Sequence, residues 1–418
     1  MNLYQQMLLA ATSVSLLIPS VARASDVVNL EEMSSYGRSQ KRSSRIDNKT
    51  FTNKVSKDIA ILKGHVDGLE DKQNDFEAGS FSETTTMEGE AIFTLGAVEN
   101  SSNIVNEATS FQYAYQLNLV TSFSENDELY VRVKTGNATD VFSNKLNGTY
   151  LNSSNGNDDT LKIDKLWYSF GIGDNNTFWI APKIHSYFMH GASVSMYEPI
   201  TKQFSHGGYG GAYGASLNSG IGWAYNNDNG FSLSSNLVSK QNNSSRGFLT
   251  DESQNNWATQ IAYTTDNYHV SFISSLKYNG WRDNYFSTSK GAARPDGNST
   301  NYGLRAYWIP DDETQALPEI SVGYDISTVE GQDADTNAYF VGLTWKDTFR
   351  EDDKIGVALG QPQTAESETV DPFAWETYYS FKVNDSMTLT SGIFGGNDRN
   401  GTEGFDVLGA IIESSFAF

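Results

Sequence analysis

The stretch Phe405-Asp-Val-Leu-Gly-Ala-Ile-Ile-Glu-Ser-Ser-Phe-Ala-Phe418 alternates in side-chain character along its length. One face of it carries Leu408, Ala410, Ile412, Ser414, Phe416 and Phe418. A side-chain period of two indicates a β-strand. A strand that runs into an aromatic residue is typical of the last strand of a bacterial outer-membrane β-barrel, where aromatics lie at the membrane–water interface. Taken alone, the segment would favour the last strand of a soluble β-sandwich, so the rest of the chain decides.

The bulk composition narrows the class of protein. The 418 residues include 29 basic and 51 acidic side chains, and the net charge of −22 argues against binding to nucleic acid. No run of 18 apolar residues follows residue 24, which excludes a membrane protein built of helices. A barrel escapes this test because only alternate residues of its strands face lipid. The absence of cysteine rules out disulfides, zinc–thiolate sites and thiol nucleophiles. We expect no cofactor.

Residues 1–24 resemble a signal peptide for export. A short apolar core, residues 7–18, is followed by Ala22-Arg-Ala24, the pattern of small residues that precedes cleavage. Residues 1–6 contain no lysine or arginine, which departs from the usual pattern, and a membrane anchor is the alternative. Residues 25–50, with Arg38, Lys41, Arg42 and Arg45 among serines, are expected to form a flexible periplasmic segment.

Residues 51–80 carry the spacing of a coiled coil. Apolar residues recur here at alternating steps of four and three residues, which is the spacing of an a/d seam. They are Val55, Ile59, Leu62, Val66, Leu69 and Phe76, with the polar Gln73 at the one remaining position of the series. Gly64 and Gly68 weaken the helix by about 1 kcal/mol each relative to alanine. Three such heptads will not hold alone, so we expect this helix to associate with copies of itself in a trimer. The alternative is one amphipathic helix packed against the mouth of a barrel.

From residue 82 to residue 418 the sequence predicts strands joined by two kinds of connection. Seven short connections, rich in Asn, Asp, Gly or Pro, lie at 124–127, 173–176, 226–229, 264–267, 310–316, 347–353 and 384–385. Eight longer polar loops lie between them, at 99–110, 137–159, 185–213, 240–255, 279–299, 328–336, 362–373 and 396–404. Strict alternation of short and long connections predicts an all-β fold, a 16-stranded antiparallel transmembrane β-barrel.

The faces of the predicted strands agree with a barrel. Leu129, Val131 and Val133 alternate with Arg132 and Lys134. Similar alternation between an apolar and a polar face recurs in residues 113–123, 270–278, 304–308 and 375–381. One face suits lipid and the other bears charge, so we expect a water-filled interior. The alternation breaks between Ile163 and Leu166, which predicts a β-bulge there.

Two stretches resemble a known family. They are Ala60-Ile-Leu-Lys-Gly-His-Val-Asp-Gly-Leu-Glu70 and Phe81-Ser-Glu-Thr-Thr-Thr-Met-Glu-Gly-Glu-Ala-Ile-Phe-Thr-Leu-Gly-Ala97. Together they are similar to the junction between coiled coil and first barrel strand in cyanobacterial outer-membrane porins of the carbohydrate-selective (OprB-type) family. The resemblance implies a trimeric 16-stranded barrel that passes small solutes and inorganic ions passively. Such porins usually carry an S-layer-homology domain before the coiled coil, and residues 25–50 are too few for it. The resemblance therefore does not extend to peptidoglycan binding.

The loop at 185–213 is the leading candidate for a segment that narrows the pore. It is more aromatic than the other loops and holds three of the five histidines. Rings of charged side chains set ion preference in pores. The candidate constriction and selectivity residues, chosen for their inward position or their place on this loop, are Arg132, Lys134, Lys183, His185, His190, Glu198, Lys202, His206, Lys277, Arg305 and Glu376. Most of these are basic, which favours anions. The acidic loops keep the opposite preference open.

The same histidines raise the question of a metal. His185, His190 and His206, with Glu198, are residue types that bind metals, but their spacings of 5 and 16 fit no metal motif, so we expect none. Their titration would make conductance depend on pH near roughly 6–7.

Three functions compete for the chain as a whole. The leading one is a non-enzymatic diffusion porin in the outer membrane of a Gram-negative-type bacterium, whose partners are small solutes, ions, lipids and the barrel-assembly machinery, with Phe416 and Phe418 as the assembly signal. The second is an outer-membrane barrel hydrolase or a ligand-specific transporter. Residues 25–80 are too short for the plug of a transporter, and a hydrolase needs a serine beside an outward histidine, whereas His269 is predicted to point inward. The third is a secreted β-rich adhesive or structural protein.

Overall fold

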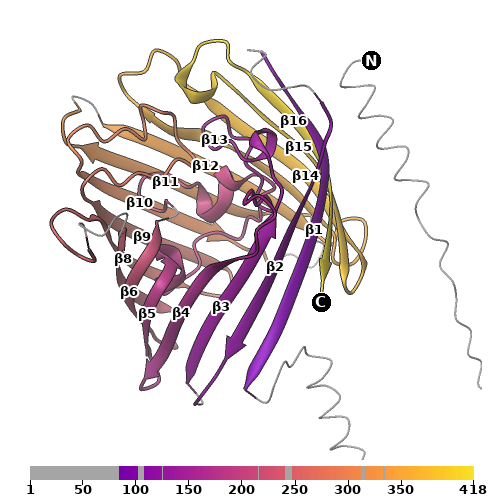
Figure 1. Ribbon diagram of the computed structural model, residues 1–418. Coiled ribbons are helices and arrows are strands. Elements are labelled where there is room, and N and C mark those ends of the chain that lie inside the picture. The colour runs from indigo at the N-terminus through magenta and orange to yellow at the C-terminus, as the bar shows by residue number, and fades with distance from the viewer. Residues whose placement is uncertain are drawn as a thin grey trace, which may run out of the picture. The chain divides into compact units, whose positions relative to one another are not determined.

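The structure of the barrel is a computed structural model that describes residues 84–101, 108–124, 126–214, 216–240, 247–311, 316–332 and 335–418. These residues form sixteen antiparallel strands, each paired with its neighbours in the chain, and β1 pairs with β16 to close the barrel (Figure 1). The predicted all-β barrel of sixteen antiparallel strands is confirmed. The predicted signal peptide, periplasmic segment and coiled-coil seam lie outside the described residues.

The strands have the following bounds. They are β1 (Thr85–Asn100), β2 (Ser110–Thr121), β3 (Asp127–Gly136), β4 (Lys162–Ile172), β5 (Asn176–His185), β6 (Leu217–Asn226), β7 (Phe231–Lys240), β8 (Gln254–Thr264), β9 (Tyr268–Lys277), β10 (Ser299–Trp308), β11 (Glu319–Val329), β12 (Thr336–Lys346), β13 (Lys354–Ala365), β14 (Phe373–Asn384), β15 (Met387–Asn397) and β16 (Val407–Ala417). In the described parts of the loops there are four short 3-10 helices: η2 (Asp140–Phe142), η3 (Ser186–Met189), η4 (Lys202–Gly207) and η5 (Arg399–Gly401).

The short connections all lie where the sequence predicts them. Acidic side chains close two of them by accepting hydrogen bonds from backbone amides of the turn. The Asp127 carboxylate accepts from the amides of Phe123 and Ser124 at 2.8 Å each, and Asp353 accepts from Thr348 at 2.7 Å. Such side-chain bonds satisfy the amides that the strand pairing leaves free, which is why Asp and Asn gather in these turns.

The outward face of the strands is apolar and carries aromatic residues at both ends. Exposed aromatics near the short turns include Phe123, Tyr268, Trp308 and Phe349, and those near the long loops include Phe111, Trp257, Tyr278 and Tyr302. Two such girdles match the two interfaces of a membrane. No helix among the described residues is long and apolar enough to cross a membrane.

The predicted bulge in β4 is confirmed. Arg132 pairs with Lys165, but the next residue, Val133, pairs with Ile163, so Asp164 is the extra residue. Because a bulge adds one residue to one strand, the two neighbours Asp164 and Lys165 both reach the inner side. Asp164 contacts Lys165 at 2.8 Å and Arg132 at 3.5 Å.

The seam between β1 and β16 depends on Gly89. Its backbone exchanges two hydrogen bonds with Phe418, at 2.6 and 3.0 Å, and the Phe418 ring lies over it. The ring also stacks on Tyr115, with centroids 6.0 Å apart. A Cβ atom at position 89 would stand only 2.1 Å from the Phe418 ring. The Phe418 ring can therefore lie over β1 because position 89 has no side chain.

We expect Gly89→Leu to weaken barrel closure, because the Phe418 ring must leave its place. The expected loss is about 1–3 kcal/mol, the usual cost of overpacking. It would appear as a lower temperature for the shift in gel mobility on heating in detergent. Gly171→Leu is the matched control, since a Cβ at Gly171 meets its nearest atom at 3.5 Å. Equal transition temperatures for both variants and the wild type would contradict this account of the seam.

Candidate functional site: the loop-lined lumen

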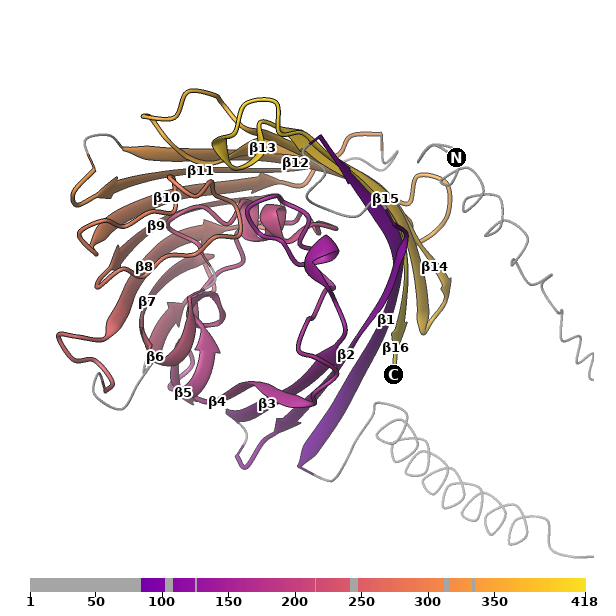
Figure 2. The ribbon, with the colours of Figure 1, turned by 45° about the horizontal axis from the view of Figure 1, so that its top comes forward.

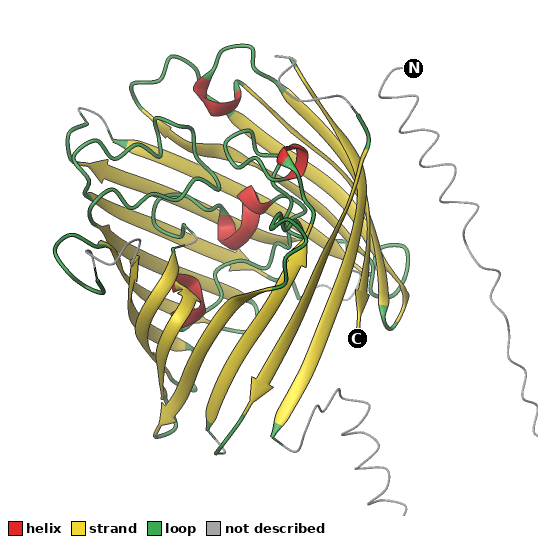
Figure 3. Cartoon of the chain, in the orientation of Figure 1, coloured by secondary structure: helices red, strands yellow, loops and turns green. Residues whose placement is uncertain are grey.

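Three long loops fold into the barrel. They are residues 186–216 between β5 and β6, here called the constriction loop, residues 137–161 between β3 and β4, and residues 278–298 between β9 and β10. The helices η2, η3 and η4 lie inside the ring of strands (Figures 2 and 3). Leu151 forms a β-bridge with Thr201, and Ser287 forms one with Gln363 on β13. The loops thus bind one another as well as the wall. The sequence predicts only the first of these loops to enter the lumen.

Glu376 on β14 fixes the tip of the constriction loop. Its carboxylate accepts hydrogen bonds from the Tyr197 hydroxyl at 2.9 Å, the Ile200 amide at 3.0 Å and the Thr201 amide at 2.9 Å. The Thr201 hydroxyl donates a fourth bond. Only 1% of Glu376 is exposed, so this predicted selectivity residue contacts the loop instead of free solvent.

The far part of the constriction loop is held by an ion pair. Arg305 on β10 contacts Asp325 on β11 at 2.6 Å, and both side chains are buried. The guanidinium group also donates to the carbonyls of His206, at 3.0 Å, and Gly208, at 2.8 Å. Asp325 in turn accepts from the Ala212 amide at 3.2 Å. Two strands therefore position the loop through its backbone.

The glycines of residues 207–214 allow this close approach. Gly207 and Gly208 have φ of +70° and +85°, which a side chain would strain. A Cβ at Gly210 would lie 2.5 Å from the Asp325 carboxyl carbon. On the wall, a Cβ at Gly323 would lie 2.1 Å from the Gly207 carbonyl oxygen. The glycine run thus serves backbone contact between loop and wall.

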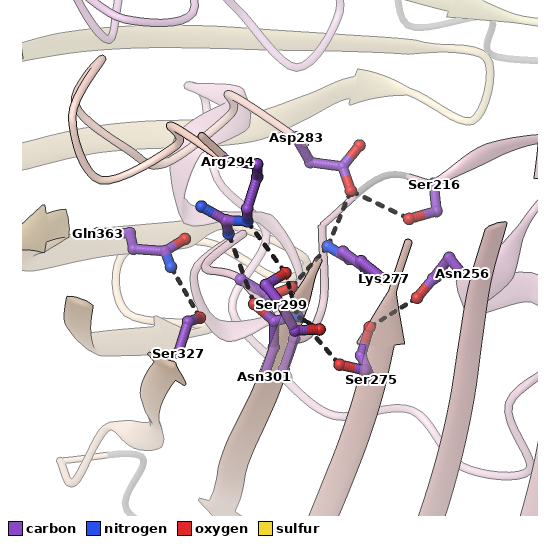
Figure 4. A network of polar contacts seen from close by, with 12 residues as sticks. Ser216, Asn256, Ser275, Lys277, Asp283, Arg294, Ser299, Asn301, Ser327 and Gln363 are labelled. Atoms are coloured by element: carbon purple, nitrogen blue, oxygen red, sulfur yellow. Dashed lines mark hydrogen bonds and ion pairs between the residues drawn. The ribbon is translucent and has the colours of Figure 1, made fainter. Parts of the chain in front are cut away.

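A second network joins the constriction loop to the β9–β10 loop (Figure 4). Lys277 on β9, only 1% exposed, donates to the Gly211 carbonyl at 2.6 Å and to Asp283 at 3.1 Å. Asp283 also accepts from the Ser216 hydroxyl at 3.0 Å. The three ion-bearing wall residues Lys277, Arg305 and Glu376, all predicted to border the pore, are covered by the loops that they bind.

Apolar packing completes this support. The buried residues of one cluster come from the constriction loop, the other two loops and the inward faces of β1 and β12–β16 and include Phe142, Leu151, Ile200, Phe204, Phe286, Phe340 and Phe394. Burying large apolar side chains contributes roughly 1.5–3 kcal/mol each. The loops therefore form part of the folded barrel.

The three loop histidines pack against aromatic rings. The rings of His206 and Tyr187 lie 4.2 Å apart, and His185 Nδ1 lies 3.1 Å from the Tyr187 hydroxyl. His190 contacts Asn236 at 3.2 Å. Burial lowers the pKa of both His190 and His206 to about 3, helped at His206 by Lys202. These two histidines are neutral near pH 7, so they do not supply the pH dependence that the sequence predicts near 6–7. Among the described residues no three His, Asp or Glu side chains gather as they would around a metal.

The remaining predicted residues separate into two places. Arg132, Lys134, Glu198 and Lys202 line one cavity of about 550 Å³ inside the barrel. Lys183 does not join them. The register of β5 shifts between Ala181 and Ile184, and Lys183 pairs with Leu166, which also pairs with the outward Val131. An extra residue in the strand moves Lys183 to the outer face, where its ammonium group donates to the Ile163 carbonyl at 2.9 Å.

The cavity also contains charged residues outside the predicted set. Lys354 pairs with Glu198 at 2.6 Å, and Lys382 pairs with Asp352 at 2.9 Å. Glu90 on β1 and Glu413 on β16 line the side of the cavity at the seam. The alternation of inward and outward positions was the signal that could have found the strand residues among them.

A closed barrel with an apolar exterior, a charged cavity and inward loops defines a passive outer-membrane channel. Comparisons with known proteins agree. The model of the carbohydrate-selective porin, OprB family, matches residues 45–394. This chain belongs to that family of non-enzymatic porins.

Sequence relatives and solved structures of similar fold were found for this chain. An uncharacterized protein of Nostoc sp. is 25% identical over 416 residues, which cover 87% of this chain and 70% of the relative. An uncharacterized protein of Synechocystis sp. is 23% identical, over 81% of this chain and 69% of the relative. Both relatives are cyanobacterial. Among solved structures, the high-pH structure of Pseudomonas putida OprB is 11% identical with a TM-score of 0.57, over 80% of this chain and 94% of that one. The outer membrane channel DcaP of Acinetobacter baumannii has a TM-score of 0.53 at 10% identity, over 82% of this chain and 100% of that one.

Proposed function

We propose that this porin passes small hydrophilic solutes and inorganic ions through the cavity between residues 198–202 of the constriction loop and the wall formed by β1–β3 and β13–β16. The observation that carries the proposal is the combination of a clamped loop and a polar cavity. Glu376 holds the loop to β14 and the Arg305–Asp325 pair holds it to β10 and β11, and the cavity beside it is lined by charged and amide side chains among others. Carbohydrates, named in the family description, belong to the same class of solute.

The charges of the cavity favour anions in this proposal. Among the described residues, the ammonium groups of Lys134 and Lys202 have no ion-pair partner, whereas Lys354 and Lys382 are paired with carboxylates. Glu90 and Glu413 also lack a cationic partner, since they accept from Gln116 at 3.0 Å and Thr94 at 3.0 Å, but they lie on the seam strands β1 and β16. The unpaired cations lie on the constriction loop and on β3, where they can attract a passing anion.

The test is the reversal potential of the reconstituted protein in planar bilayers with unequal KCl concentrations. We expect stable ohmic steps and a potential of the sign given by chloride preference. Lys134→Glu should move the potential toward cation preference. Lys290→Glu, on the exposed part of the β9–β10 loop, is the matched control and should leave it unchanged. A wild-type channel that prefers potassium would overturn the anion assignment, and absence of any steps would overturn the channel.

A homotrimer is part of the same proposal. One solved structure of similar fold is described as the trimer form of Vibrio cholerae OmpT, with a TM-score of 0.50 and 13% identity over 80% of this chain and 99% of that one. The coiled-coil spacing of residues 55–76 supports a trimer held together in the periplasm. Phe416 and Phe418 are proposed as the signal read by the barrel-assembly machinery. Conductance steps grouped in threes would be the expected sign of the trimer.

A further inference from the structure

We infer that the lumen contains a binding site for a compact oxyanion, such as sulfate or inorganic phosphate, built by Arg132, Lys134 and Lys202 with Lys165 behind them. The inference rests on the proposed channel and goes beyond it. A channel with a general preference for anions needs only a diffuse positive field, whereas a site holds one ion at one place. Three observations about these side chains point to a site.

The first observation is how the basic side chains come together. Arg132 and Lys134 occupy successive inward positions of β3, and the bulge at Asp164 brings Lys165 to the same side from β4. Lys202 reaches the same cavity from the constriction loop, whose position the Glu376 carboxylate fixes through the neighbouring Thr201. Two strands and a clamped loop thus converge, so the arrangement is set before any ligand arrives.

The second observation is that the charges of this group are not balanced. The single carboxylate of Asp164 forms ion pairs with both Arg132 and Lys165, so one negative charge is shared between two positive charges. In the part of the chain that the structure describes, the side chains of Lys134 and Lys202 make neither a hydrogen bond nor an ion pair. Glu90, which accepts from Gln116 at 3.0 Å and Ser415 at 2.7 Å, adds a second carboxylate, so four basic side chains stand against two acidic ones. Burial, with Lys134, Lys165 and Arg132 as neighbours, lowers the pKa of Lys202 to about 7. An anion among these cations would relieve their mutual repulsion.

The third observation is an unused donor. The Nε atom of Arg132 is buried, lies 3.5 Å from Asp164, and makes no hydrogen bond to any described residue. The guanidinium group lies near the rings of Tyr130 and Phe188, at 6.0 and 5.8 Å from their centroids, which restricts its orientation. A buried donor without an acceptor costs about 1–3 kcal/mol, and an oxyanion supplies the acceptor. Guanidinium donors match oxyanions in a bidentate geometry that chloride cannot use.

The experiment measures block of chloride current by sulfate in planar bilayers, at constant ionic strength and at pH 6, where Lys202 carries its charge. Sulfate is fully ionised at pH 6, so it is the first probe, and inorganic phosphate is the second. We expect saturable block of the wild-type channel. Lys134→Gln and Lys202→Gln should each raise the half-blocking concentration about tenfold, the loss expected for one charge-assisted hydrogen bond. Lys202→Arg should retain the block.

Lys382→Gln is the matched control, because it removes the same charge from the same cavity at a residue already paired with Asp352. It should change the half-blocking concentration less than twofold, within about the scatter of an exposed ion pair. Ohmic steps without saturable block would overturn the site and leave the channel standing. An equal effect of Lys382→Gln would also overturn it, since a diffuse field would then explain the block. If one lysine variant fails to insert, the other lysine variant carries the test.

Discussion

Glu376→Gln should release the tip of the constriction loop and give a channel with larger and noisier conductance. The carboxylate accepts four hydrogen bonds from Tyr197, Ile200 and Thr201, and glutamine offers one acceptor oxygen and an amide group that faces donors. Losing most of these bonds costs about 3–4 kcal/mol, which lowers the ratio of docked to released loop by a factor on the order of a hundred or more. The strand pairing of β14 does not involve this side chain, so the barrel should still fold.

Single-channel recordings at constant voltage measure this directly. Glu330→Gln is the matched control: it makes the same change at an exposed residue of the β11–β12 loop, which does not line the cavity. Its conductance should stay near that of the wild type. A folded Glu376→Gln protein with wild-type conductance and noise would mean that the tip is held by other contacts.

Arg305→Met should destabilise the protein more than removal of both Arg305 and Asp325. The single change leaves the Asp325 carboxylate buried beside Gly210 and Ala212 without its cation. Breaking one partner of a buried ion pair costs about 3–5 kcal/mol, while replacing both partners with apolar residues is often close to neutral. We therefore expect Arg305→Met/Asp325→Leu to recover part of the loss. The bonds from Arg305 to the His206 and Gly208 carbonyls are not recovered.

The temperature of the gel-mobility shift on heating ranks the three proteins, with the double variant between the single variant and the wild type. Lys382→Met is the matched control. It breaks the Lys382–Asp352 pair, in which the side chains are 51% and 56% exposed, and should change the transition temperature little, because exposed ion pairs contribute little to stability. A double variant no more stable than Arg305→Met would show that the pair acts through its backbone bonds alone.

Most of the barrel was predictable because turns and alternation are local signals. The seven short connections, the sixteen strands and the bulge at Asp164 follow from turn residues and from the period of two. Lys183 was misplaced because Pro182 and Lys183 interrupt that period in β5, and one added residue inverts every later position.

The candidate site was predictable only in part. Alternation tells which face a side chain occupies, and it selected Arg132 and Lys134 correctly as inward residues. It does not tell whether a loop covers that face. Lys277, Arg305 and Glu376 share the inward face but are buried under the constriction loop, a contact between segments far apart in the sequence. The inward folding of residues 137–161 and 278–298 has the same cause. Their aromatic residues Phe142 and Phe286 were the available hint, since large apolar side chains on a long polar loop need a place to pack.

The contacts that hold the constriction loop come from the Arg305–Asp325 pair on β10 and β11 and from Glu376 on β14. The unpaired cations lie elsewhere, on β3 and on the segment of the loop that these contacts hold. Mechanical support and solute preference are thereby encoded in different strands. Related proteins can change the ion preference of the channel by single substitutions at positions of β3 that face the lumen, with little effect on folding. Changing its bore requires coordinated substitutions in the supporting strands. Closely related channels should therefore diverge first in which ions they admit and only later in how large a molecule fits.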